Sequence, residues 1–159
     1  MNITTVALSE EALEGIGVLL TPAKRVKPEP DAETSYFDTV DDLGLEAPCS
    51  SGVVEGRPRP KKLYRMERHL HTREALVALE GEAIACLAPP QEPGAAGFEG
   101  LVAVRVKTGQ AFILEKGAWH GSPFPVGRKP ARLLVIFRSG TGRTDLEYRD
   151  LPQAVSVRA

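Results

Sequence analysis

Short apolar and β-branched runs, separated by glycine and proline, fill the sequence from residue 61 onward and limit its fold more than any other feature. Seven of these runs are predicted to be strands, at residues 63–68, 75–79, 82–87, 101–106, 111–114, 131–137 and 146–148. Strands of this length and spacing are typical of all-β sandwiches and barrels. The chain shows no alternation of strands with long helices, so a parallel βαβ sheet is not indicated. We therefore expect an all-β fold whose barrel core spans residues 61–150.

The N-terminal third of the sequence has a different pattern of residues. Ser9 is a suitable N-cap for a short helix that carries Ala12, Leu13 and Ile16 on one side. Prolines and charges then dominate up to residue 60, which favours loops and edge strands. A length of 159 residues suits one domain. We expect residues 1–159 to form it, with residues 1–60 supplying the helix, loops and edge strands.

Composition excludes several classes of partner. The formal net charge is −1, so no overall field favours nucleic acid. The basic stretch at residues 56–62 is brief and has no interleaved aromatic residues. Three glutamates between residues 10 and 14 interrupt the N-terminal apolar residues, and no run approaches membrane-spanning length. Cys49 and Cys86 are too few for a disulfide framework. We expect a cytoplasmic protein with no nucleic-acid or membrane partner.

All three histidines fall in two short segments. His69 and His71 would share one face of an extended strand, because side chains alternate there, and Glu74 follows closely. His120 ends the second segment, residues 109–120, which is punctuated by glycines. Two imidazoles, a carboxylate and a third imidazole from separate strands would form a mixed N and O site for Zn, Ni, Mn or Fe(II). A solvated strand face remains the alternative for the histidine pair, and a solvated edge charge for Glu74.

The two segments resemble the paired motifs of the cupin superfamily. Those motifs run roughly G-x5-H-x-H-x(3 or 4)-E-x6-G and G-x5-P-x-G-x2-H-x3-N. Here Glu74 comes one residue early, Glu115 replaces the proline and Phe124 replaces the asparagine. The resemblance implies a cupin-type antiparallel β-barrel of jelly-roll form, with its ligands pointing into the mouth.

A narrower resemblance, to the ureidoglycolate lyase family, extends over most of the chain. It rests on residues 8–20, 35–38, 66–79, 118–120 and 137–152, in which Glu67-Arg68-His69 and Trp119-His120 are the most specific parts. The resemblance implies a carbon-nitrogen lyase that cleaves ureidoglycolate to glyoxylate and urea in purine and allantoin catabolism. It also implies a homodimer.

The substrate, a small carboxylate, also needs an acid or base and a cationic group. Position suggests Glu115 or Glu67 as general acid or base, and Arg138 or Lys116 as the carboxylate-binding group. Two alternatives stay open. One is a non-catalytic cupin that binds a metal or small molecule, because one barrel hosts many functions. The other is a metal-dependent dioxygenase or isomerase acting on another small acid.

Overall fold

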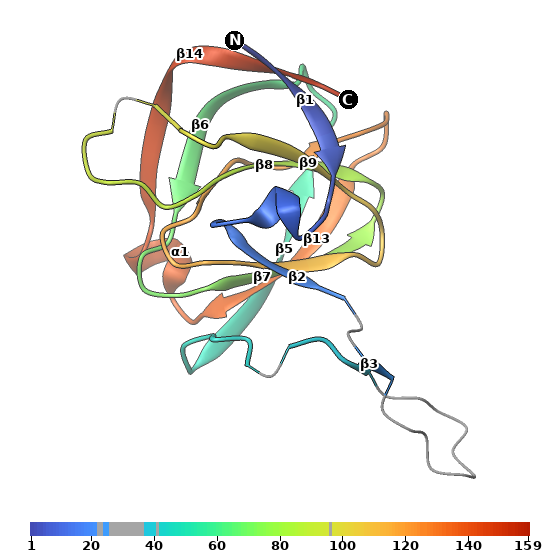
Figure 1. The fold of residues 1–159 in the computed structure, drawn as a ribbon, viewed down its shortest axis with the longest axis vertical. Coiled ribbons are helices and arrows are strands. Elements are labelled where there is room, and N and C mark those ends of the chain that lie inside the picture. Colours follow the sequence, from blue (N-terminus) through green and yellow to red (C-terminus); the bar gives the residue numbers. More distant parts are fainter. Residues whose placement is uncertain (22–23, 26–36, 41, 96) are drawn as a thin grey trace.

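The computed structural model consists almost entirely of β-strands, as Figure 1 shows. It describes residues 1–21, 24–25, 37–40, 42–95 and 97–159. Part of the expected loop region, residues 26–36, lies outside this description, as does the first half of the 35–38 segment. The strands are β1 (Asn2–Ala7), β2 (Gly17–Leu20), β3 (Lys24–Arg25), β4 (Phe37–Asp38), β5 (Cys49–Gly56), β6 (Lys62–Arg68), β7 (Glu74–Glu80), β8 (Ala83–Ala88), β9 (Val102–Val106), β10 (Ala111–Leu114), β11 (Trp119–His120), β12 (Phe124–Pro125), β13 (Ala131–Arg138) and β14 (Glu147–Arg158). A 3-10 helix, η1 (Glu11–Leu13), and the one-turn helix α1 (Thr141–Thr144) complete the described elements.

Two sheets form a closed barrel. The larger has the order β11-β6-β14-β1-β9-β8-β12, and β11 also pairs with β8, which closes the sheet on itself. The second has the order β2-β10-β7-β13-β5. Most pairings are antiparallel, but β1 runs parallel to both β14 and β9. The predicted all-β barrel is confirmed, with mixed rather than purely antiparallel pairing.

The N-terminal region contributes more to the barrel than loops and edges. β1 lies between β14 and β9 inside the larger sheet, and the two chain termini lie near each other (Figure 1). β2 and β5 form the edges of the smaller sheet. The predicted short helix is present as η1, where the Ser9 hydroxyl oxygen accepts the backbone N–H of Ala12 at 3.1 Å. η1 ends at Leu13, and Gly15, in the turn that follows, has a φ of +70°, which suits glycine.

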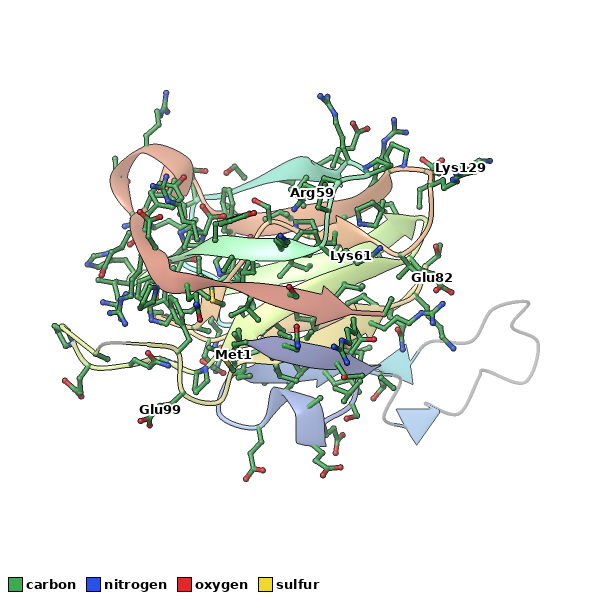
Figure 2. All side chains as sticks on the ribbon, turned by 90° about the horizontal axis from the view of Figure 1, so that it is seen from above. Met1, Arg59, Lys61, Glu82, Glu99 and Lys129 are labelled. Carbon is green, nitrogen blue, oxygen red and sulfur yellow. The ribbon has the colours of Figure 1, made fainter. Side chains whose placement is uncertain are left out.

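Alternation along the strands separates core from solvent. On β13, Leu133 and Val135 are buried, whereas Arg132 between β5 and β7 is exposed and pairs with Glu55 and Glu80. Charged side chains such as the labelled Glu99 and Lys129 point outward in Figure 2. The period of two therefore directs one set of side chains into the barrel, where the site lies. No helix among the described residues is long and apolar enough to cross a membrane.

Candidate metal centre

Three of the four predicted ligands meet inside the barrel. His69, Glu74 and His120 each offer one donor atom, and these atoms lie within 4.8 Å of one another. The Glu74 Oε2 atom lies 3.2 Å from His120 Nε2 and 3.7 Å from His69 Nε2. His69 directly follows β6, Glu74 begins β7, His120 lies on the short strand β11, and all three are buried. The two sequence segments that contain the histidines therefore converge as expected.

Hydrogen bonds on the far side of each ring orient the imidazoles. His69 Nδ1 lies 2.7 Å from the backbone carbonyl oxygen of Asp145, and His120 Nδ1 lies 3.3 Å from that of Ala118. A carbonyl can only accept, so each Nδ1 carries the proton and each Nε2 keeps its lone pair. Both lone pairs then face Glu74. In known metal sites, a hydrogen bond from the far ring nitrogen fixes the ligating histidine in the same way.

The chemistry of this donor set fits a divalent cation. Glu74 Oε2 and His120 Nε2 are buried and have no hydrogen-bond partner. A carboxylate and two imidazole nitrogens that all present lone pairs to one point need a cation or a proton between them. Two histidines and one carboxylate suit Fe(II), Zn, Mn and Ni.

His71 does not join this centre. β6 ends at Arg68, and the chain turns at Leu70, so the expected alternation from His69 to His71 is lost. The His71 side chain is 66% exposed, and its Nδ1 lies 2.9 Å from Asp145 Oδ1. The prediction that His69 and His71 share a face is wrong because the strand stops between Glu67 and His71. The residue that shares a face with His69 is Glu67, two positions earlier.

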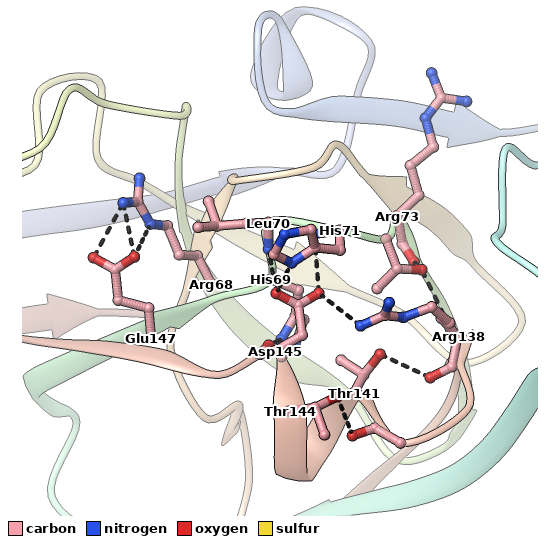
Figure 3. A network of polar contacts seen from close by, with 12 residues as sticks. Arg68, His69, Leu70, His71, Arg73, Arg138, Thr141, Thr144, Asp145 and Glu147 are labelled. Carbon is pink, nitrogen blue, oxygen red and sulfur yellow. Dashed lines mark hydrogen bonds and ion pairs between the residues drawn. The ribbon is translucent and has the colours of Figure 1, made fainter.

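Asp145 holds the turn that redirects the chain. Its side chain is 3% exposed, and it accepts the backbone N–H groups of Leu70 and His71, both at 2.9 Å, in addition to the His71 ring (Figure 3). Arg138 Nη2 lies 3.8 Å from Asp145 Oδ2. Burial raises the pKa of Asp145, but the hydrogen bonds from His71 and Leu70 outweigh it, so the pKa lies below its ordinary value. Sequence patterns did not reveal this residue, because the backbone groups of Leu70 and His71 that it binds are more than 70 positions away.

A second connection joins the two histidine segments. The backbone N–H of Gly117 donates to the His69 carbonyl at 2.6 Å. Gly117 has a φ of +79°, a conformation that glycine adopts without strain. The glycine of the second segment therefore brings the turn before β11 against the end of β6, and so sets His120 beside His69.

A cavity of about 260 Å³ extends from the centre into the barrel. Its wall is formed mainly by apolar residues at alternating positions of β7, β8, β10 and β13, as the strand period requires. Its polar lining consists of Glu67, His69, Glu74, His120 and Ser122. The centre therefore faces a cavity that is polar around the donor atoms and apolar elsewhere.

Glu67 is the one predicted acid or base that lines this cavity. Its Oε1 lies 3.6 Å from His120 Nε2, and its side chain is 30% exposed. Tyr148 is opposite Glu67 in the pairing of β14 with β6. Burial and the neighbouring Glu67 carboxylate both raise the pKa of Tyr148, so the phenol stays protonated beside that carboxylate.

The other predicted catalytic residues lie elsewhere. Glu115 pairs with Arg73 at 2.7 Å, and Lys116 pairs with the exposed Glu46 at 2.6 Å. Neither residue lines the cavity. Arg138 follows Phe137, which does line it, so alternation along β13 turns Arg138 away, toward Asp145. Closeness in sequence to the motifs was a poor guide for these three residues, because a strand or turn sends neighbouring side chains in different directions.

Trp119 also points away from the cavity. It is fully buried, stacks edge-on with Phe98, and contacts the guanidinium groups of Arg68 and Arg149 over its ring, both 4.5 Å from the centroid. Arg68 in turn makes a two-oxygen pair with Glu147. These contacts support β11 from behind and hold His120 toward the centre.

Comparison with known proteins agrees with this arrangement. The family model described as ureidoglycolate lyase matches residues 1–158. The chain belongs to the ureidoglycolate lyase family. Members of a ureidoglycolate lyase family are enzymes of the lyase class, which fits a buried donor set beside a cavity. No curated protein matches the chain significantly.

The fold is similar to that of a solved structure. A dTDP sugar isomerase from Desulfovibrio desulfuricans G20 matches with a TM-score of 0.52 and 15% identity, over 87% of this chain and 83% of that one. Oxalate decarboxylase from Bacillus subtilis matches with a TM-score of 0.43 and 18% identity, over 56% of this chain. This lyase-family chain covers only 21% of the oxalate decarboxylase chain. At 15% identity, the likeness to the isomerase shows a shared fold alone.

Proposed function

We propose that this chain cleaves ureidoglycolate to glyoxylate and urea at the centre formed by His69, Glu74 and His120. The observation that carries the proposal is the convergence of three buried donor atoms, two of them without hydrogen-bond partners, at a cavity in a chain of this family. His69 Nε2, His120 Nε2 and the Glu74 carboxylate would hold a divalent transition metal. When bound, such an ion supplies Lewis-acid chemistry, which lowers the pKa of a hydroxyl group and stabilises developing negative charge.

The reaction needs one proton to move from oxygen to nitrogen. Ureidoglycolate is a carbinolamide, whose central carbon bears a hydroxyl, a carboxylate and a urea nitrogen. Loss of the hydroxyl proton lets the oxygen form the carbonyl of glyoxylate, and the electron pair of the broken C–N bond passes to the urea nitrogen. That nitrogen then takes up a proton, so no oxidant or reductant is consumed.

Glu67 is placed to carry this proton. Its carboxylate lines the cavity close to His120 and retains contact with solvent. It accepts the hydroxyl proton as general base and returns it to the departing nitrogen as general acid.

The experiment is a turnover assay with defined metal content. The purified protein is depleted with a chelator, reloaded separately with Zn, Ni, Mn or Fe(II), and incubated with ureidoglycolate. Equal amounts of glyoxylate and urea are expected with at least one metal, and Glu74→Gln should abolish both. Glu115→Gln is the matched control, since Glu115 lies outside the cavity and pairs with Arg73. The proposal would be overturned if no urea were released with any of the metals.

One observation favours a second candidate. Two histidines and one carboxylate also form the ligand set of non-haem Fe(II) oxygenases. Oxygen consumption by the Fe(II)-loaded protein with a small hydroxy acid, without urea release from ureidoglycolate, would identify this activity instead. A stoichiometric metal with neither reaction would identify a non-catalytic binding cupin.

The setting we infer is a homodimer in the cytoplasm that serves purine and allantoin catabolism. Cys49 is exposed and free, which suits a reducing compartment. Tyr64 and Tyr148 expose 61% and 55% of their surface on neighbouring strands β6 and β14, and exposed tyrosines are frequent at protein interfaces. Sedimentation of the protein would report a dimer or a monomer directly.

A further inference from the structure

The cavity beside the metal centre is larger than a small polar acid requires. Its volume is about 260 Å³, whereas an apolar cavity of about 150 Å³ already accommodates benzene. Four of its five polar lining residues gather around the centre. A substrate bound there through its hydroxyl and carboxylate would leave much of the remaining volume to its nitrogen substituent.

That remaining wall is apolar. It includes Leu76 of β7, Leu87 of β8, Phe112 of β10 and Leu133 of β13, each of them buried. The described lining residues contain no Lys, Arg, Asn or Gln. A terminal urea group has several N–H donors and a carbonyl, and few of these would find partners against such a wall. Unpaired buried amides weaken binding, whereas apolar groups gain from burial in the same place.

We propose that the preferred substrates are N-acyl-α-hydroxyglycines with an apolar acyl group, of which N-benzoyl-α-hydroxyglycine is an example. This inference rests on the proposed function, because the reaction is the same C–N cleavage at the same site. The hydroxyl proton leaves, the oxygen forms the carbonyl of glyoxylate, and the C–N electron pair passes to nitrogen. The nitrogen takes up a proton, and the products are glyoxylate and a primary amide such as benzamide.

The first experiment is a substrate series on the metal-loaded protein. Glyoxylate release is measured with ureidoglycolate and with N-acetyl-, N-butanoyl- and N-benzoyl-α-hydroxyglycine. The expected kcat/KM rises with the size of the acyl group, and the benzoyl compound exceeds ureidoglycolate by about 10- to 100-fold, the discrimination that small apolar increments produce in apolar pockets. The inference is overturned if ureidoglycolate is cleaved with the highest kcat/KM, and the proposed function then stands.

The second experiment measures binding without turnover. The melting temperature of the chelator-treated protein is recorded with benzamide and with acetamide at equal concentration. Benzamide is expected to raise it and acetamide to leave it unchanged, because only benzamide carries an apolar group for the cavity. If ureidoglycolate itself is not cleaved with any metal, the proposed function fails. An equal response to both amides overturns the inference, whatever the activity.

A matched pair of variants on β7 locates the effect. Leu76 lines the cavity, whereas Leu79 is 48% exposed and does not. Leu76→Gln is expected to reduce the preference for the benzoyl over the acetyl compound at least about tenfold, because it places an amide in the apolar wall. Leu79→Gln should keep the preference. Equal preferences in both variants would contradict the assignment, and the wild-type series decides the question should Leu76→Gln fail to fold.

Discussion

Replacement of Asp145 by asparagine tests how the metal centre is built. The Asp145 carboxylate is almost fully buried and accepts the backbone N–H groups of Leu70 and His71 with different oxygens. Asparagine keeps one acceptor oxygen and turns an NH₂ group toward the other donor, which loses one charge-assisted hydrogen bond and leaves an N–H unpaired. Hydrogen bonds to charged groups contribute about 1.5 to 3 kcal/mol each, so we expect the free energy of unfolding to fall by about 2 to 4 kcal/mol.

The same change should weaken metal binding. His69 lies directly before the residues that Asp145 holds, and its ring bonds to the Asp145 backbone carbonyl. Loss of an outer-shell partner typically lowers metal affinity by about 10- to 100-fold. We expect a reduction in this range for Zn or Mn, measured by calorimetric titration, while urea denaturation measures the stability.

Asp150→Asn is the matched control. Asp150 lies on β14, five residues after Asp145, and pairs with Arg65, but both side chains are more than half exposed. Exposed pairs contribute about 0 to 1 kcal/mol, so stability and metal affinity should change little. If Asp145→Asn costs no more stability than Asp150→Asn, the carboxylate does not hold the turn. If stability falls but the affinity stays, the turn does not position His69.

The contribution of Asp145 to stability should depend on pH in a definite direction. The pKa of Asp145 lies below 3.8 in the folded protein. Its contribution to stability is therefore present above pH 3.8, its ordinary value, and is lost as the pH falls through the folded pKa. The difference between wild type and Asp145→Asn should be largest near neutral pH and shrink in acid.

Three other predictions concern single side chains. His71→Ala should retain metal stoichiometry, measured by elemental analysis, whereas His120→Ala should lose bound metal. Glu67→Gln should lower kcat by about 10²- to 10⁴-fold with the metal retained, because it removes general acid-base catalysis; an unchanged kcat would exclude Glu67. Burial raises the pKa of the Cys86 thiol to about 12, from 9.0, so an alkylating reagent at pH 8 should modify only Cys49 in the native protein. This pKa shift stabilises the folded protein below pH 9.0. The stabilisation is lost by about 1.4 kcal/mol per pH unit as the pH rises from 9.0 toward 12, so Cys86→Ala should lose less stability in alkali than the wild type does.

Local sequence patterns predicted the barrel strands well. Short apolar runs bounded by glycine or proline specify strands such as β10 and β13 without knowledge of their partners. β1 was missed because its pattern of half-exposed residues carries little signal, and its place inside the sheet depends on parallel pairing with two distant strands. Pairing of this kind is a tertiary property.

The same limit applies to the centre. Convergence of His69 with His120 followed from two motifs, and the strand predicted at residues 63–68 ends where β6 ends. The turn that follows it, which directs His71 away from the centre, was not predicted, because hydrogen bonds from the backbone of Leu70 and His71 to Asp145 determine it. The ion pair between Arg73 and Glu115 likewise joins residues 42 positions apart and removes Glu115 from the cavity. Spacing alone identifies which residue types are available, whereas strand ends decide which of them face inward.

His69 lies at the metal centre and His71 does not, and this difference bears on how a substrate could bind in the cavity. Because His71 binds Asp145, the chain offers three ligands instead of four, and a bound divalent ion would keep an additional position for substrate oxygens. The cavity lining contains neither Lys nor Arg among the described residues, so no guanidinium or ammonium group is available there for a carboxylate. A hydroxy acid that uses both its hydroxyl and its carboxylate as ligands needs no such group. The loss of His71 from the centre and the apolar cavity wall therefore favour the same kind of substrate: an α-hydroxy acid bound at its polar end, with its nitrogen substituent in the barrel.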